Sequence, residues 1–132
     1  MKMPYLMNVE EASVYGKRKF VNTKGHTECV EFVRQVTAAP QTSLWIRGRL
    51  VKSIKPGELA RGTAIATFDD HAKYPTDSSG RHAAIYLSHD SRGIVVLDQW
   101  NSQGEVLQRV IRFHRPPGTK RSNDGDSFYV IE

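Results

Sequence analysis

The stretch HTECVEFVRQV, residues 26–36, contains Cys29, the only cysteine of a 132-residue chain. A cysteine is nucleophilic as thiolate, and the first turn of a helix favours that form through unpaired backbone N–H groups and the positive end of the helix dipole. The apolar residues of this stretch recur at helical spacing, at Cys29, Phe32, Val33 and Val36. They predict a short helix over residues 27–37, with Thr27 as its N-cap and a stop near Pro40. A cysteine in an apolar stripe is commonly a core residue, so this helix alone leaves both roles open.

A histidine begins a second patterned segment, GRHAAIYL, residues 80–87. Strand alternation places His82 on one face with Ala84 and Tyr86, and the remaining residues on the other face. Because Ala84 is small, we expect the helix to approach this face closely, so that thiol and imidazole meet.

The next segment, GIVVLDQW, residues 93–100, is predicted to return antiparallel to the first. If Leu87 pairs with Gly93, Asp98 lies opposite His82, whereas a slip of one residue places Gln99 there. A carboxylate fixes the imidazole tautomer and stabilises the imidazolium, while a glutamine only orients the ring. We therefore expect Asp98 as the third residue, with Gln99 as the alternative.

Five further residues are candidates for contact with a substrate, on the strength of their types and their expected places beside the cysteine and histidine: Trp45, His26, Arg81, Gln99 and Trp100. The polar loop 69–81 leads directly into the histidine strand, and loops of this length are commonly functional. The spacing of His26 and Cys29 would suit the beginning of a zinc site, but no second Cys or His pair follows, so no metal ligand is predicted.

The elements that must position these residues are one helix followed by β-rich runs. The predicted strands cover residues 62–68, 82–87, 93–100, 105–113 and 127–132, and a further short helix is expected within residues 8–15. This order predicts an α+β fold in which the helix packs on a curled antiparallel sheet of about five strands. The length supports one domain, residues 1–132.

Composition narrows the class of protein. The formal net charge of +5 suits an acidic partner, such as nucleic acid, an anionic envelope polymer or an acidic inhibitor, and equally a merely soluble surface. A single cysteine allows no internal disulfide, and the N-terminal stretch MKMPYLMNVEEASVYG has neither a signal-peptide nor an anchor pattern. We expect synthesis in a cytoplasm and no insertion into a membrane.

The helix-borne cysteine followed by GTAIATF, GRHAAIYL and GIVVLDQW resembles the NlpC and CHAP branch of the papain-like cysteine peptidases. More closely, HTECVEFVRQ, TSLWIRG, GTAIATFD, GRHAAIYL and VLDQW resemble a family of small type VI secretion amidase effectors, over roughly residues 22–113. The resemblance implies Cys29 as nucleophile, His82 as general base and Asp98 as the third polar residue. It implies no metal or organic cofactor.

The same resemblance implies an antibacterial enzyme that is secreted into the periplasm of a target cell, degrades the cell wall and is countered by a cognate immunity protein. Its substrate would be the stem peptides of peptidoglycan. Relatives of this class cut either the cross-link between D-Ala and diaminopimelate or the bond between γ-D-Glu and diaminopimelate, and the closer resemblance favours the cross-link. We expect a monomer.

Two other functions are compatible with the sequence. A cysteine-dependent protein deamidase or transacylase toxin would use the same three residues. A basic β-rich module that binds nucleic acid would use the arginines of LQRVIRFHR, residues 107–115, although this stretch has a single aromatic residue, Phe113.

Overall fold

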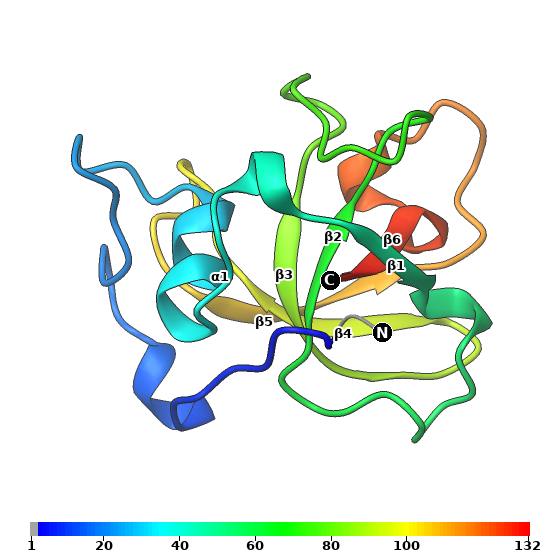
Figure 1. Ribbon diagram of the computed structural model, residues 1–132, viewed down its shortest axis with the longest axis horizontal. Helices are drawn as coiled ribbons and strands as arrows, with labels where there is room; N and C mark the ends of the chain where they lie inside the picture. Colours follow the sequence, from blue (N-terminus) through cyan, green and yellow to red (C-terminus); the bar gives the residue numbers. More distant parts are fainter. Residues whose placement is uncertain (1–2) are drawn as a thin grey trace.

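Within residues 3–132, which are the residues the structure describes, six strands form one antiparallel sheet in the order β1-β6-β2-β3-β4-β5 (Figure 1). In this computed structural model the strands are β1 (Arg47–Leu50), β2 (Ala64–Thr67), β3 (Ala83–His89), β4 (Gly93–Asp98), β5 (Leu107–Arg112) and β6 (Phe128–Ile131). The first two residues of the N-terminal stretch considered above lie outside the described part. No helix in that part is long and apolar enough to cross a membrane.

The α+β prediction is confirmed, and each of the five predicted runs overlaps one strand, although β3 continues two residues beyond its predicted run of 82–87. The remaining strand, β1, was not predicted. Its sequence RGRL has three residues that no strand pattern favours, and all four residues are exposed or half-buried. Such a strand lies at the sheet edge and pairs only with β6, so its order comes from backbone pairing and not from an apolar pattern.

The helix α1 runs from Cys29 to Val36, and its first residue is the cysteine. The predicted N-cap is wrong: Glu28 occupies that position without a side-chain cap, and Thr27 is buried and donates its hydroxyl to the carbonyl of Trp100 at 3.2 Å. The helix ends where expected, since Ala38 adopts a left-handed conformation with φ of 69°. A short 3₁₀ turn, Glu11–Val14, lies within the second predicted helix.

The helix covers one face of the sheet and packs on β3 (Figure 1). Its buried residues join the apolar side chains of this face in one core, which includes Val14, Phe32, Val33, Val36, Ala83, Ile85, Leu87 and Leu97. The expectation that the helix would lie over Ala84 is therefore wrong. An apolar helix stripe needs a broad apolar surface, which Ile85 and Leu87 provide, while Ala83 supplies the small residue on the same face.

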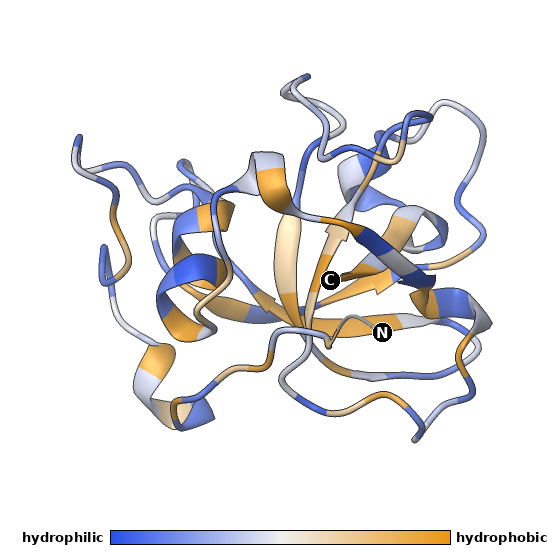
Figure 2. Cartoon of the chain, in the orientation of Figure 1, coloured by the Kyte–Doolittle hydropathy of each residue, from blue (hydrophilic) through white to orange (hydrophobic). Residues whose placement is uncertain are grey.

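The other face of the sheet encloses a second core. Its residues come from β2 to β6 and from the segment that follows β1, and they are Val51, Ile54, Leu59, Ile65, Ala84, Tyr86, Ile94, Val96, Ile111, Phe113, Phe128 and Val130. The strands at the centre of the sheet are the most apolar part of the chain, and the loops are polar (Figure 2). The loops after β2 and after β5 rise from the same end of the sheet (Figure 1).

Candidate active site

His82 immediately precedes β3 and is held there by its neighbour strand β2. The hydroxyl of Thr67 accepts a hydrogen bond from the His82 backbone N–H at 3.0 Å, and the Thr67 N–H donates to the His82 carbonyl, also at 3.0 Å. The His82 side chain is 7% exposed, and its imidazole has edge contacts with the rings of Trp100 and Phe128, each at 6.2 Å between centroids. Backbone and ring are therefore both fixed.

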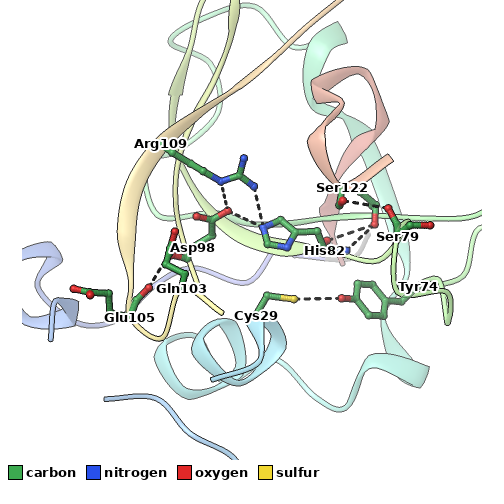
Figure 3. Close-up of polar contacts among 10 residues, drawn as sticks. Cys29, Tyr74, Ser79, His82, Asp98, Gln103, Glu105, Arg109 and Ser122 are labelled. Carbon is green, nitrogen blue, oxygen red and sulfur yellow. Dashed lines mark hydrogen bonds and ion pairs between the residues drawn. The ribbon is translucent and has the colours of Figure 1, made fainter. Parts of the chain in front are cut away.

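Asp98, at the end of β4, lies behind the imidazole. Its carboxylate is completely buried, and Oδ2 accepts from His82 Nε2 at 2.7 Å and from Arg109 Nε at 2.8 Å (Figure 3). Oδ1 has no hydrogen-bond partner among residues 3–132. Because Nε2 donates to Asp98, Nδ1 is the nitrogen that remains for the thiol.

The register that led to Asp98 is wrong by two residues at this end of the hairpin. The structure pairs Ile85 with Leu97, which continues to His82 opposite Trp100, and a bulge follows at Leu87. A shift of two residues keeps every side chain on its predicted face, because the strand period is two. His82 and Asp98 therefore meet as diagonal neighbours, whereas a slip of one residue would have separated them.

The residues that follow Asp98 hold the start of α1. Gln99 is completely buried, and its amide donates to the carbonyls of Phe20 and Glu28 at 2.8 and 2.9 Å. The Trp100 carbonyl accepts from Thr27. The end of β4 thus fixes two parts of the site. The Asp98 carboxylate holds the His82 imidazole, and Gln99 and Trp100 hold the start of the helix that carries Cys29.

The Cys29 thiol is partly buried beside His82, with its sulfur 3.6 Å from the Tyr74 hydroxyl (Figure 3). Burial raises the pKa of the thiol, but the hydrogen bond and charge of His82 lower it, as do the Tyr74 hydroxyl and the Ala83 backbone N–H. The net result is a thiol pKa below its ordinary value. A thiolate is therefore favoured at this position.

The imidazole responds in the opposite direction. Burial lowers the pKa of His82, but its hydrogen bond to Asp98 and the hydrogen bond and charge of Cys29 raise it to about 9. The pKa of Tyr74 is raised, mainly by burial and further by Cys29, so its hydroxyl stays protonated and can donate to the sulfur. The lowered pKa of Cys29 and the raised pKa of His82 both favour the thiolate and imidazolium pair over the neutral pair.

These groups line a cleft of about 660 Å³. Its lining comes from the start of α1, the loop 69–81, the end of β4, β5 and the segment after β5, and includes Glu28, Cys29, Tyr74, Arg81, His82, Trp100, Arg109, Lys120 and Ser122. Trp100 and Arg81 are thus brought to the cleft. The other candidates for substrate contact are not.

Trp45 is 2% exposed, donates its ring N–H to the Pro40 carbonyl at 2.8 Å and packs edge-on against Tyr74 at 5.0 Å. Trp45 therefore supports Tyr74 from the buried side of the loop. His26 is exposed and closes the turn before α1 through its backbone, which pairs with Asn22. Gln99 faces the start of α1, as described above. No cluster of three or more side chains that could hold a metal ion occurs among residues 3–132.

Sequence reasoning gave Arg109 no place in the active site and gave Tyr74 no role of its own. A signal for Arg109 was present: alternation along β5 places it on the same face as the buried Ile111. An arginine on the buried face of a strand requires an acidic partner. No comparable pattern marks Tyr74, because a loop has no fixed period.

Three comparisons bear on the family of the chain. The family described as domesticated amidase effector 2 matches residues 4–131. The type VI secretion amidase effector 2 protein of Salmonella typhi is 37% identical over 117 residues, which cover 81% of this chain and 86% of that protein. Domesticated amidase effector 2 of Ixodes scapularis is 40% identical over 108 residues, which cover 80% and 70% respectively.

A solved structure of type 6 secretion amidase effector 2 has the same fold, with a TM-score of 0.77 and 30% identity over 96% of this chain and 93% of that one. The resemblance to type VI secretion amidase effectors that was read from the sequence motifs is confirmed. Sequence, family match and fold agree, and the chain belongs to the domesticated amidase effector 2 family of amidase effectors.

Proposed function

We propose that this protein is a cysteine amidase that hydrolyses amide bonds in the stem peptides of peptidoglycan. One observation supports this most directly: in a member of an amidase effector family, a helix-borne Cys29 lies beside a buried His82 that donates to Asp98. Nucleophile, base and orienting carboxylate are the parts that acyl transfer by a thiol requires.

The proposed reaction begins with the Cys29 thiolate attacking the amide carbonyl, which forms a carbon–sulfur bond. Two donors are assigned to the developing oxyanion: the backbone N–H of Cys29 at the start of α1 and the Tyr74 hydroxyl, which lies 3.6 Å from the sulfur. The His82 imidazolium protonates the leaving amine as the carbon–nitrogen bond breaks. Neutral His82 then takes a proton from a water molecule as its oxygen attacks the acyl carbon. The carbon–sulfur bond breaks, which releases the acyl group as a carboxylic acid and restores the thiolate and imidazolium.

Several finer features belong to the same proposal. The chain is a single NlpC/CHAP-like domain of the papain-like superfamily spanning residues 1–132, and it acts as a monomer. It cuts the cross-link between D-Ala and diaminopimelate in the periplasm of a target cell, and an immunity protein protects the producer. Trp100 and Arg81 contact the substrate, since both line the cleft.

The arginines that suggested nucleic-acid binding favour this reading instead. Arg109 is directed to Asp98 inside the cleft, so it does not form an exposed basic stripe along β5. A polymer backbone would require several such cations on one open face.

The test is mass spectrometry of Gram-negative sacculi treated with the wild-type protein or with Cys29→Ala and then digested by muramidase. Loss of cross-linked dimers with the wild-type protein alone is the expected result, and the new termini identify the bond. Circular dichroism checks that the variant is folded. An unchanged muropeptide profile with folded wild-type protein contradicts the proposal, and ammonia release from a protein substrate would then assign the site to a deamidase.

A further inference from the structure

The cleft carries an excess of positive charge. Three permanent cations line it, Arg81, Arg109 and Lys120, against one carboxylate, Glu28. Arg81 and Lys120 are exposed and lie on loops. Arg109 differs from them because it comes from β5 and its side chain is 26% exposed.

Arg109 is held in one orientation by two contacts. Its Nε donates to Asp98 Oδ2 at 2.8 Å (Figure 3). Its guanidinium lies over the Trp100 ring at 5.1 Å from the centroid. Both partners are themselves fixed, since Asp98 is completely buried and the Trp100 carbonyl accepts from Thr27. A cation fixed in advance loses little conformational entropy when it binds an anion.

The terminal nitrogens of Arg109 are not used by the protein. The nearest candidate acceptor is His82 Nε2, 3.4 Å from Nη2, but Nε2 carries the proton that it donates to Asp98 at 2.7 Å. Two donors cannot bond to each other, so this contact is the approach of two positive groups. No other acceptor for Nη1 or Nη2 occurs among residues 3–132.

A planar fork of N–H donors, fixed and facing a cleft, is suited to a carboxylate. We propose that Arg109 binds a carboxylate of the substrate, and that the protein therefore prefers acidic over amidated stem peptides. The inference rests on the proposed function. Because Nη2 lies against the far side of the imidazole from the thiol, the carboxylate belongs to a residue within about two positions of the scissile amide.

The experiment compares two forms of one purified cross-linked muropeptide dimer, the native form with free carboxylates and the same dimer with its carboxyl groups converted to carboxamides. We expect the wild-type protein to have a kcat/KM roughly 10- to 100-fold higher for the native form, as is typical of a hydrogen bond to a charged group. The preference should fall to about one in Arg109→Gln and be partly restored in Arg109→Lys. Arg112→Gln, on the same strand but outside the cleft, should retain the full preference.

A binding measurement keeps the test independent of turnover, because Arg109→Gln also loosens Asp98. Calorimetry in the Cys29→Ala background should show the native dimer binding more tightly than the amidated one, and the difference disappearing when Arg109→Gln is added. Equal binding of both forms, or an equal loss for both in Arg109→Gln, overturns the carboxylate assignment. A wild-type protein that cleaves both forms equally refutes this inference alone, whereas one that cleaves neither form nor sacculi refutes the proposed function.

Discussion

The two sides of the cleft are built differently. On the sheet side, His82 and Asp98 are 5% and 0% exposed, and each is fixed by contacts from neighbouring strands. On the loop side, Tyr74 and its surrounding segment are fixed by weaker and more exposed ties, such as the Arg121–Asp77 ion pair at 3.6 Å and the Ser122 hydroxyl on the Ser79 carbonyl at 3.1 Å. These ties join two loops that are 43 residues apart.

This difference in burial and stability suits two different tasks. In the proposed mechanism, proton transfer tolerates little error in position, which agrees with the location of its groups on buried strand ends. Groups that surround a substrate must admit and release it, so they lie on loops with lower local stability. Substitutions on the sheet side should therefore change catalysis far more than equivalent substitutions on the loop side.

The largest effect is expected from His82→Ala. It removes the base and also the group that lowers the Cys29 pKa, so kcat/KM on a cross-linked muropeptide should fall by about 10⁴-fold or more. The rate of alkylation of Cys29 by iodoacetamide at neutral pH should fall as well. Residual activity within tenfold of wild type, in a variant with a native circular dichroism spectrum, would place the base elsewhere.

Asp98→Asn should have the next largest effect, about 10²- to 10⁴-fold in kcat, because the imidazole loses its orienting anion. Burial lowers the pKa of His82, while the hydrogen bond to Asp98 helps to raise it to about 9. If the imidazolium protonates the leaving amine, wild-type activity falls as the pH rises through about 9. In Asp98→Asn this alkaline decline should move to lower pH, and a pH–rate profile that does not move would contradict the role of the carboxylate.

Tyr74→Phe, on the loop side, should reduce kcat by about 5- to 50-fold. The substitution keeps the ring contact with Trp45 and removes only the hydroxyl beside the sulfur. Because that hydroxyl lowers the Cys29 pKa, the thiol pKa should rise, which the pH dependence of alkylation measures directly. An unchanged thiol pKa together with unchanged kcat would show that the hydroxyl contributes nothing to the site.

The smallest effect is expected from Arg121→Gln, which breaks the tie between the two loops. Exposed ion pairs contribute little, so kcat should change by less than about threefold, with the larger change in KM. The change in KM should shrink at high salt, where the wild-type pair is screened. A loss of kcat as large as that of Asp98→Asn would remove the distinction between the two sides of the cleft.

The sequence predicts an element of the fold well where its apolar residues recur with a regular period. The helix stripe and the five alternating runs have strong periods, so α1 and β2 to β6 were found with short errors at their ends. His82 and Asp98 were also predicted on the same face of the sheet, where the structure has them. An error of two residues in register does not change the face of a side chain. Edge strand β1 lacks such a period and was missed.

The features that were predicted wrongly depend on three-dimensional packing, which the local sequence pattern does not contain. The choice between the Ala83 and Ala84 faces depended on where the helix found a broad apolar surface, which local alternation does not state. Thr27 was read as a cap, yet its hydroxyl is used 73 residues away at the Trp100 carbonyl. Gln99 was treated as a rival of Asp98, although the two residues lie on opposite faces and hold different elements. The assignment of catalytic roles to Cys29, His82 and Asp98 remains a prediction.

The place of β6 in the sheet has a consequence for synthesis of the protein. This strand, Phe128–Ile131, inserts between β1 and β2, and Phe128 packs against the imidazole of His82. A nascent chain that has reached only residue 127 lacks the central strand of one half of its sheet and one wall of the histidine pocket. Cys29 and His82 are synthesised before this strand, but the pocket around the imidazole is complete only after Ile131 has been added.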